Sequence, residues 1–167
     1  VWNRLRKITS GCVITKNSMN TVLGVRFDGT GWAEAMQKAR EFLRGEKLNY
    51  IFTPNPEMLV DAQHDQYFKD TLNTGDLNLC DGFGIQLFTG LPKVSGVDFA
   101  MELCGLLAES GQSVYLLGTG NDQTVQRAVI HLQVRYPNLT IAGVDPGYPI
   151  QLTSSPSGAQ LKYDAAK

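Results

Sequence analysis

The chain has 167 residues, which is enough for one domain with its own hydrophobic core. Its hydrophobic fraction of 43% and charged fraction of 19% are ordinary for a soluble globular protein, and they exclude a fibre or a wholly disordered chain. The net charge of -1 gives no overall positive field, so we expect no nucleic-acid partner, and any anionic ligand must be bound by a local site.

The first 20 residues form a basic N-terminal segment without acidic residues. No continuous apolar run follows its basic residues, and no run in the chain approaches the ~20 apolar residues of a membrane span, so we expect neither a secretory signal nor a spanning helix. Trp2, Leu5 and Ile8 lie at helical spacing and permit a weak interfacial helix on an anionic membrane. A frayed terminus is the simpler interpretation. We expect a cytoplasmic protein, with peripheral association at the inner face of the cell membrane left open.

In the first half of the chain, strands and helices are expected to alternate. Residues 21–27 are rich in β-branched and apolar side chains and predict a strand, and residues 31–44 carry apolar residues at helical spacing. A strand at 50–52 then leads to a helix for which Asn55 is a good N-cap and Pro56 a good first residue. A second helical piece around Phe68 and Leu72 and a strand at 76–80 follow.

In the second half, a short helix at 82–89 and a loop at 90–98 precede an apolar helix at about 97–109. Residues 113–117 (SVYLL) are the clearest strand of the sequence, and Asn121 is suited to cap the helix after it. Residues 139–144 predict another strand. From 149 to 167 the chain is rich in Ser, Gly and Ala and has no sustained periodicity, so a poorly ordered tail is expected after a domain at 21–148.

This alternation predicts a Rossmann-like α/β fold, in which a parallel sheet is covered by helices on both faces. The turns at 53–55, 81–84 and 118–121 would then all lie at the carboxyl edge of the sheet, where open α/β sheets bind their ligands.

The cysteines and histidines do not indicate a metal or disulfide site. Cys12, Cys80 and Cys104 are an odd number and form no C-x-x-C pair, and the two histidines, His64 and His131, are isolated. Cys80 and Cys104 fall in apolar segments, so we expect them to be buried like small hydrophobic residues, in a reducing compartment.

Asp81 is the strongest candidate for a catalytic residue. It follows a strand and precedes Gly82, and Thr53 and Asn55 are expected at the same edge. A helix-capping aspartate would explain Asp81 equally well. No Ser-His or Cys-His arrangement competes for the role of nucleophile. One carboxylate suits a single proton transfer, in contrast to the two carboxylates of most glycoside hydrolases.

A nucleotide-cofactor oxidoreductase is an alternative. Gly118 and Gly120 fit the first two positions of G-x-G-x-x-G, and Asp145 is placed to bind a ribose, but the third position is Gln123. An ordinary tight turn explains the glycine pair as well.

Several motifs together resemble the WecG/TagA/CpsF family of bacterial glycosyltransferases, over about residues 22–148. They are Thr53-Pro54-Asn55-Pro56-Glu57, Asp81-Gly82-Phe83-Gly84-Ile85, Ser95-Gly96-Val97-Asp98, Leu117-Gly118 and Gly147-Tyr148.

The resemblance implies an inverting, metal-independent transferase without a cofactor. It would move an N-acetylhexosamine-type sugar, such as N-acetylmannosamine, from a UDP-sugar donor to a polyprenyl-diphosphate-linked acceptor, in the synthesis of teichoic acid or another cell-surface polysaccharide. Asp81 matches the family's proposed base, and Thr53 and Asn55 match its active-site threonine and asparagine. The expected substrate-binding residues are Gly82, Gly84, Lys93, Ser95, Asp98, Gly118 and Thr119.

The sequence departs from the family pattern in two places. Lys93 stands where the family usually has Arg, and Lys cannot make a bidentate contact to phosphate. The later G-x-P-x-Q-E motif has no counterpart after Tyr148, so we expect a truncated member. A catalytically inactive remnant that acts as a binding module therefore stays an alternative, and homo-oligomer formation is left open.

Overall fold

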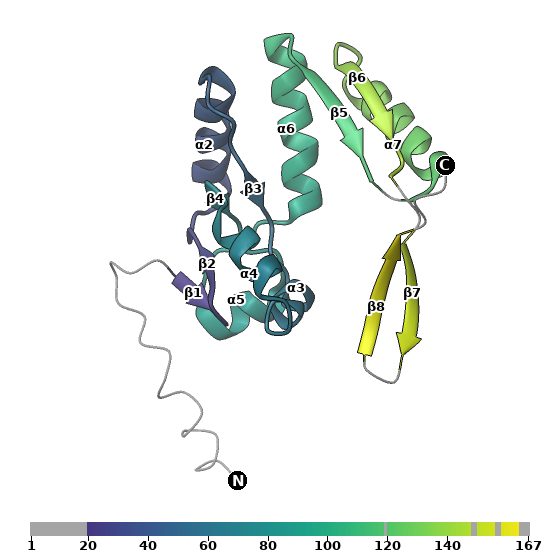
Figure 1. Ribbon diagram of the computed structural model, residues 1–167. Helices are drawn as coiled ribbons and strands as arrows, with labels where there is room; N and C mark the ends of the chain where they lie inside the picture. Colours follow the sequence, from purple (N-terminus) through teal and green to yellow (C-terminus); the bar gives the residue numbers. More distant parts are fainter. Residues whose placement is uncertain (1–19, 119, 148–149, 156–157, 164–167) are drawn as a thin grey trace. The chain divides into compact units, whose positions relative to one another are not determined.

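The computed structural model describes residues 20–118, 120–147, 150–155 and 158–163 (Figure 1). The chain divides into two compact units, Val1–Phe99 and Ala100–Lys167, and each is described by itself. The basic segment predicted for the N-terminus and the predicted site residue Thr119 lie outside the described residues. The domain limits at 21 and 148 stay a prediction.

The first unit begins with a hairpin. Strands β1 (Asn20–Val22) and β2 (Val25–Phe27) pair antiparallel around Leu23 and Gly24. The prediction of one continuous strand at 21–27 is therefore wrong. Both turn residues have positive φ, 52° and 82°, as a two-residue hairpin turn requires. Leucine rarely adopts this conformation, so the turn has no clear signal in the sequence.

Five helices begin among the described residues of the first unit and confirm the predicted ones to within a few residues. They are α2 (Trp32–Arg44), α3 (Pro56–Asp61), α4 (Gln66–Asn73), α5 (Phe83–Thr89) and α6 (Gly96–Ser110). As predicted, Asn55 caps α3: its Oδ1 accepts a hydrogen bond from the Met58 N–H at 2.9 Å, and Pro56 is the first helical residue.

A parallel ladder forms the centre of the first unit. Strands β3 (Ile51–Phe52) and β4 (Leu77–Asn78) are short, but their hydrogen bonds continue beyond both strands at alternate residues. The backbone N–H groups of Leu77, Leu79 and Asp81 donate to the carbonyls of Tyr50 (3.2 Å), Phe52 (2.8 Å) and Pro54 (3.2 Å), respectively. The ladder therefore runs on to the loop that contains Thr53 and Asn55.

The other edge of β4 binds two further segments. The Asp28 N–H donates to the Asn78 carbonyl at 3.0 Å, and the Val94 N–H donates to the Cys80 carbonyl at 2.9 Å. Lys93 forms an isolated parallel bridge with Cys80. The loop at 90–95 is thereby held beside the strand that leads to Asp81.

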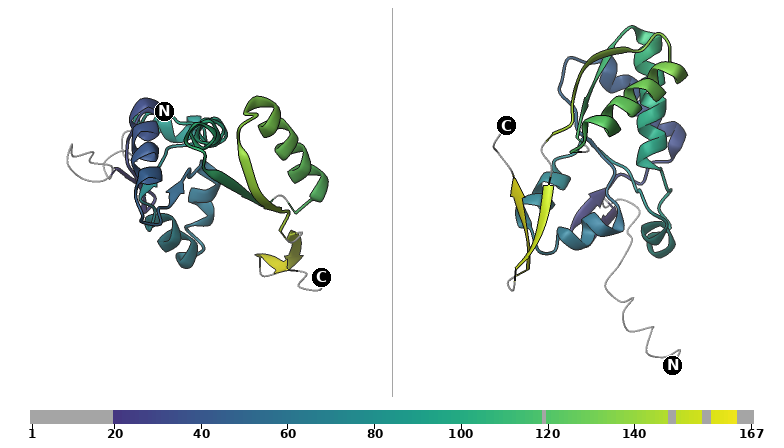
Figure 2. Two further views of the ribbon diagram at one scale, coloured as in Figure 1. Left: turned by 90° about the horizontal axis from the view of Figure 1, so that it is seen from above. Right: turned by 90° about the vertical axis from the view of Figure 1, so that its right-hand side faces the viewer.

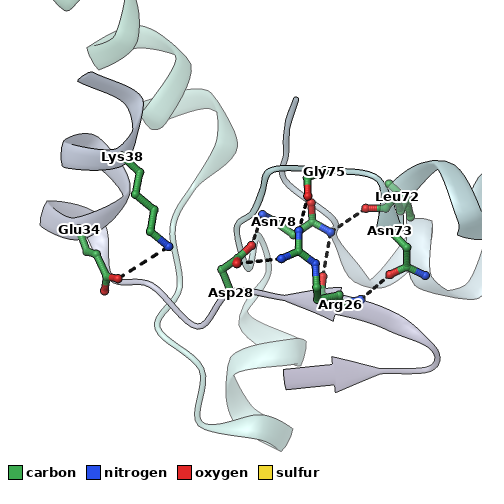
Figure 3. Close-up of polar contacts among 8 residues, drawn as sticks. All are labelled: Arg26, Asp28, Glu34, Lys38, Leu72, Asn73, Gly75 and Asn78. Carbon is green, nitrogen blue, oxygen red and sulfur yellow. Dashed lines mark hydrogen bonds and ion pairs between the residues drawn. The ribbon is translucent and has the colours of Figure 1, made fainter. Parts of the chain in front are cut away.

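A buried asparagine joins β2 to β4 (Figure 3). The Asn78 side chain is fully buried, and its Nδ2 donates to the carbonyls of Arg26 at 2.9 Å and Leu72 at 2.7 Å. The Asn78 N–H donates to Asp28 Oδ2 at 2.7 Å. The Arg26 guanidinium binds Asp28 at 3.0 Å and also the Gly75 carbonyl. Because buried polar groups are costly unless they are paired, this network fixes the register of the two strands.

Apolar side chains from the hairpin, α3, α4 and the segment around α5 form the core of this unit. The buried members are Val25, Phe27, Leu59, Ala62, Leu72, Cys80, Ile85 and Leu91.

The second unit contains a β-α-β motif. Strands β5 (Ser113–Leu117) and β6 (Thr140–Asp145) are parallel and are connected by α7 (Asp122–Arg135), which covers one face of the pair (Figure 2). Asn121 caps α7 as predicted, with its Oδ1 accepting from the Gln123 N–H at 2.8 Å. The predicted strands at 113–117 and 139–144 are confirmed.

A second hairpin follows. Strands β7 (Ile150–Ser155) and β8 (Gly158–Tyr163) pair antiparallel, with Ile150 opposite Tyr163 and Ser155 opposite Gly158. The poorly ordered tail expected at 149–167 stays a prediction.

The fold is mixed α/β. Among the described residues the named strands pair two by two, and β3–β4 and β5–β6 are the parallel pairs. The predicted continuous parallel sheet is not among these pairings. No helix in the described part of the chain is both long enough and apolar enough to cross a membrane.

Candidate active site

The candidate site lies where the β3–β4 ladder ends. The last hydrogen bond of the ladder joins the Asp81 N–H to the Pro54 carbonyl at 3.2 Å. Thr53 and Asn55 flank Pro54, so the structure brings the three predicted catalytic residues to one edge. Each of the three is partly exposed. A ligand at the end of the two strands could therefore reach them.

The glycines after Asp81 permit this close approach. Gly82 has φ 148°, a conformation that side-chain-bearing residues rarely adopt. A Cβ atom on Gly82 would lie 2.7 Å from Pro56 Cδ, and one on Gly84 would lie 3.5 Å from Pro56 Cγ. The Pro56 ring therefore packs directly on the turn. This packing gives Gly82 a structural role, while the predicted binding of substrate by Gly82 and Gly84 stays a prediction.

The Asp81 carboxylate binds the start of α6. Its Oδ2 accepts a hydrogen bond from the Gly96 N–H at 3.0 Å. The alternative that Asp81 caps the helix that follows it is wrong, because the N-cap of α5 is Gly82 and no side chain caps that helix. The hydrogen bond instead orients the carboxylate from a residue 15 positions away.

Gly96 leaves space for two side-chain oxygens. A Cβ atom at Gly96 would lie 2.6 Å from Thr53 Oγ1 and 3.0 Å from Asp81 Oδ2. Both oxygens therefore converge on the first residue of α6. Gly96 belongs to the Ser95-Gly96-Val97-Asp98 motif but is not among the residues predicted for the site. A glycine at the first position of a helix, between two polar motifs, was the available signal.

The local chemistry favours Asp81 over its neighbour as the reactive group. Burial, followed by the charge of Asp81, raises the pKa of the Cys80 thiol above its ordinary value. The thiol is therefore protonated at neutral pH and is a poor nucleophile. Cys80 and Cys104 are both buried and free, as the sequence predicted.

Asn55 caps a helix, and this structural role limits what its side chain can do at the site. Because Oδ1 caps α3, the Nδ2 group is the part of the side chain that can donate a hydrogen bond to a substrate.

The remaining predicted substrate-binding residues fall into two groups. The first group, in the first unit, runs from the bridge to Cys80 to the first turn of α6 and consists of Lys93, Ser95 and Asp98. Within it, the Asp98 N–H donates a long hydrogen bond of 3.4 Å to Ser95 Oγ. Gly118 belongs to the second unit, where its N–H donates to the Asp145 carbonyl at 2.9 Å.

Comparisons with known proteins agree with these motifs. The model of the Glycosyl transferase WecG/TagA/CpsF family matches residues 20–160. The chain is 29% identical over 129 residues to the N-acetylglucosaminyldiphosphoundecaprenol N-acetyl-beta-D-mannosaminyltransferase of Staphylococcus aureus strain NCTC 8325, covering 72% of this chain and 50% of the relative. The protein of the same name from strain MRSA252 is 28% identical over 129 residues, with the same shares covered. The chain thus spans about half the length of the curated relatives it matches. Because the family model matches most of the sequence, the chain belongs to the Glycosyl transferase WecG/TagA/CpsF family.

Proposed function

We propose that this chain carries the catalytic edge of an inverting, metal-independent glycosyltransferase. The enzyme transfers N-acetylmannosamine or a related N-acetylhexosamine from a UDP donor to a polyprenyl-diphosphate-linked sugar, in the synthesis of teichoic acid or another surface polysaccharide. The observation that carries this proposal is the convergence of Thr53 Oγ1 and Asp81 Oδ2 on the N-terminus of α6, at the end of a parallel ladder.

Asp81 is the general base of the proposed reaction. The Gly96 N–H holds the carboxylate in place. The carboxylate accepts the proton of an acceptor hydroxyl while that oxygen bonds to the anomeric carbon of the donor. The bond from this carbon to the UDP oxygen breaks on the opposite face, so the configuration is inverted. Thr53 Oγ1 and Asn55 Nδ2 are placed to hydrogen-bond the sugars and orient them.

A helix N-terminus stabilises the negative charge that develops on the departing diphosphate, and a lysine nearby can bind a substrate phosphate. Backbone N–H groups at a helix N-terminus bind phosphate, and α6 begins at the site. Lys93 is exposed and belongs to the loop that pairs with Cys80. It supplies a single positive charge in place of the planar two-point contact of arginine.

The β-α-β motif of the second unit suits the nucleotide of the donor. Gly118 follows β5, and α7 begins close behind it, which is the arrangement that holds nucleotide phosphates in Rossmann-like folds. We infer that Gly118 and Thr119 contact the donor. A continuous Rossmann-like sheet stays an expectation from the alternation of strands and helices.

Two alternatives predict different experimental results. An NAD(P)-dependent oxidoreductase is less well supported, because the third glycine is missing and Asp145 Oδ1 accepts a hydrogen bond from the Gly147 N–H at 2.8 Å. A binding module without activity is the other alternative.

The test is acceptor-dependent release of UDP. The chain is incubated with UDP-N-acetylmannosamine, UDP-N-acetylglucosamine or UDP-glucose, with and without a short-chain N-acetylglucosaminyl-diphospholipid. We expect release of UDP from one donor only when the acceptor is present, and no loss of activity in EDTA. Saturable binding of NADH without UDP release would favour the oxidoreductase. Binding of the acceptor without turnover would favour the binding module.

A further inference from the structure

Helix α5 exposes three large apolar side chains. Phe83, Leu87 and Phe88 are 67%, 67% and 86% exposed, although each is a large hydrophobic side chain. We call these three residues the α5 ridge. On the opposite side of the helix, Ile85 is buried in the core of the first unit. Packing of Ile85 in the core therefore holds the helix in place, while the three exposed side chains remain largely uncovered among the described residues.

The ridge begins at the candidate active site. Phe83 is the first residue of α5 and stands two positions after Asp81, and the turn between them is packed against Pro56. The far end of α5 is fixed as well, because the Gly90 N–H donates to the Gln86 carbonyl at 2.8 Å and Leu91 is buried. The position of the ridge relative to Asp81 is thus set by packing at both ends of the helix.

The segment that contains the ridge carries one positive charge between Asp81 and Asp98. From Gly82 to Val97 the sequence contains no acidic residue and one basic residue, Lys93. Lys93 is exposed, and within the described part of the chain it forms no ion pair. Its bridge to Cys80 places its backbone beside the residue that precedes Asp81. One segment therefore presents an apolar surface and a single cation, both adjoining the candidate base.

We propose that the α5 ridge binds the first isoprenoid units of the lipid-linked acceptor and that Lys93 binds its diphosphate. This inference rests on the proposed function, which supplies an acceptor with an apolar chain, a diphosphate and a sugar in that order. The three parts match the ridge, Lys93 and Asp81. A helix of seven residues is about 10 Å long, so the ridge fits one chain. It is too small for a stable dimer, which buries about 800 Å² per partner.

Two soluble probes separate the binding contribution of the isoprenoid tail from that of the diphosphate. Binding of farnesyl diphosphate and of inorganic diphosphate is measured by calorimetry on the full chain. We expect farnesyl diphosphate to bind at least about tenfold more tightly, because several isoprenoid carbons are removed from water when the tail binds. Leu87→Ser with Phe88→Ser should reduce this ratio to about one. Lys93→Gln should weaken both ligands and leave the ratio unchanged.

Tyr67→Ser is the matched control, because Tyr67 is an aromatic residue of the same unit, is 83% exposed and lies on α4. It should leave both affinities unchanged. Unfolding temperature shows whether the ridge variant is folded, and Phe88→Ser alone provides a milder second variant. Equal affinity of the wild type for both probes, or an unchanged ratio in the folded ridge variants, would overturn the proposal.

Two further measurements identify other occupants of the ridge. Ridge-dependent binding to phosphatidylcholine vesicles that contain no isoprenoid would assign the surface to the membrane, and ridge-dependent self-association in sedimentation would assign it to a second copy. Either result without a tail preference overturns the proposal. If acceptor-dependent UDP release persists but does not respond to tail length or to the ridge variants, this inference fails while the proposed function stands. If the chain prefers farnesyl diphosphate to diphosphate but releases no UDP, the proposed function fails while the ridge still binds an isoprenoid tail.

Discussion

Replacement of Gly96 by alanine tests whether the site depends on close approach to α6. The added Cβ would lie 2.6 Å from Thr53 Oγ1 and 3.0 Å from Asp81 Oδ2, whereas ordinary contacts begin at 3.4 Å. The two oxygens must therefore move by about 0.8 Å and 0.4 Å. Because a misplacement of about 1 Å can cost about 100-fold in rate, we expect turnover to fall by roughly 10- to 100-fold.

The same substitution should have a separate and moderate effect on stability. Overpacking costs about 1–3 kcal/mol, and the better helix propensity of alanine offsets up to about 1 kcal/mol. Turnover is measured as acceptor-dependent UDP release, and stability by urea unfolding. Gly31→Ala is the matched control, because Gly31 also stands at the start of a helix and a Cβ there meets no atom within 4 Å. The reasoning is refuted if Gly96→Ala, when folded, turns over as fast as Gly31→Ala.

Three other substitutions separate structural from chemical roles. Asn55→Asp keeps an oxygen to cap α3 but removes the Nδ2 donor, so urea unfolding should change little while turnover falls about tenfold or more; an unchanged rate would restrict Asn55 to capping. Asn78→Ala leaves two carbonyl oxygens without their donor and should lower the free energy of unfolding by about 2–4 kcal/mol, and a loss below about 1 kcal/mol would contradict the network. The hydrogen bond from Lys47, followed by that from the Tyr50 N–H, holds the pKa of Asp76 below its ordinary value. The ionised Asp76 carboxylate therefore contributes fully to stability above its pKa in the unfolded state, which is about 3.9. This contribution is lost as the pH falls through the lower pKa of the folded state. Asp76→Asn should therefore flatten the fall in stability below about pH 4 in urea titrations.

Local rules predicted the elements that carry the site. Asn55 and Pro56 were identified as cap and first residue of a helix because each acts on its own turn, and the same holds for Asn121 at α7. The order of strands and turns also placed Thr53 and Asp81 at one edge, as the ladder hydrogen bonds now show.

The contacts that complete the site could not be predicted because they join distant residues. Asp81 was considered as a cap for the adjacent helix, but its partner is Gly96 at the start of another. The buried role of Asn78 depends on carbonyls contributed by β2 and α4, which no local pattern indicates. The turn at Leu23 was missed because leucine is an unusual residue at positive φ.

The central claim is that the Asp81 carboxylate acts as a base, and Asp81→Asn tests it most directly. The amide keeps an oxygen for the Gly96 N–H but cannot accept the proton of the acceptor hydroxyl, so urea unfolding should be nearly unchanged. Acceptor-dependent UDP release should fall by about two to four orders of magnitude. Asp81→Ala, which also removes the hydrogen bond, should lose the same activity and about 1–2 kcal/mol of stability. Wild-type turnover in a folded Asp81→Asn variant would contradict the account.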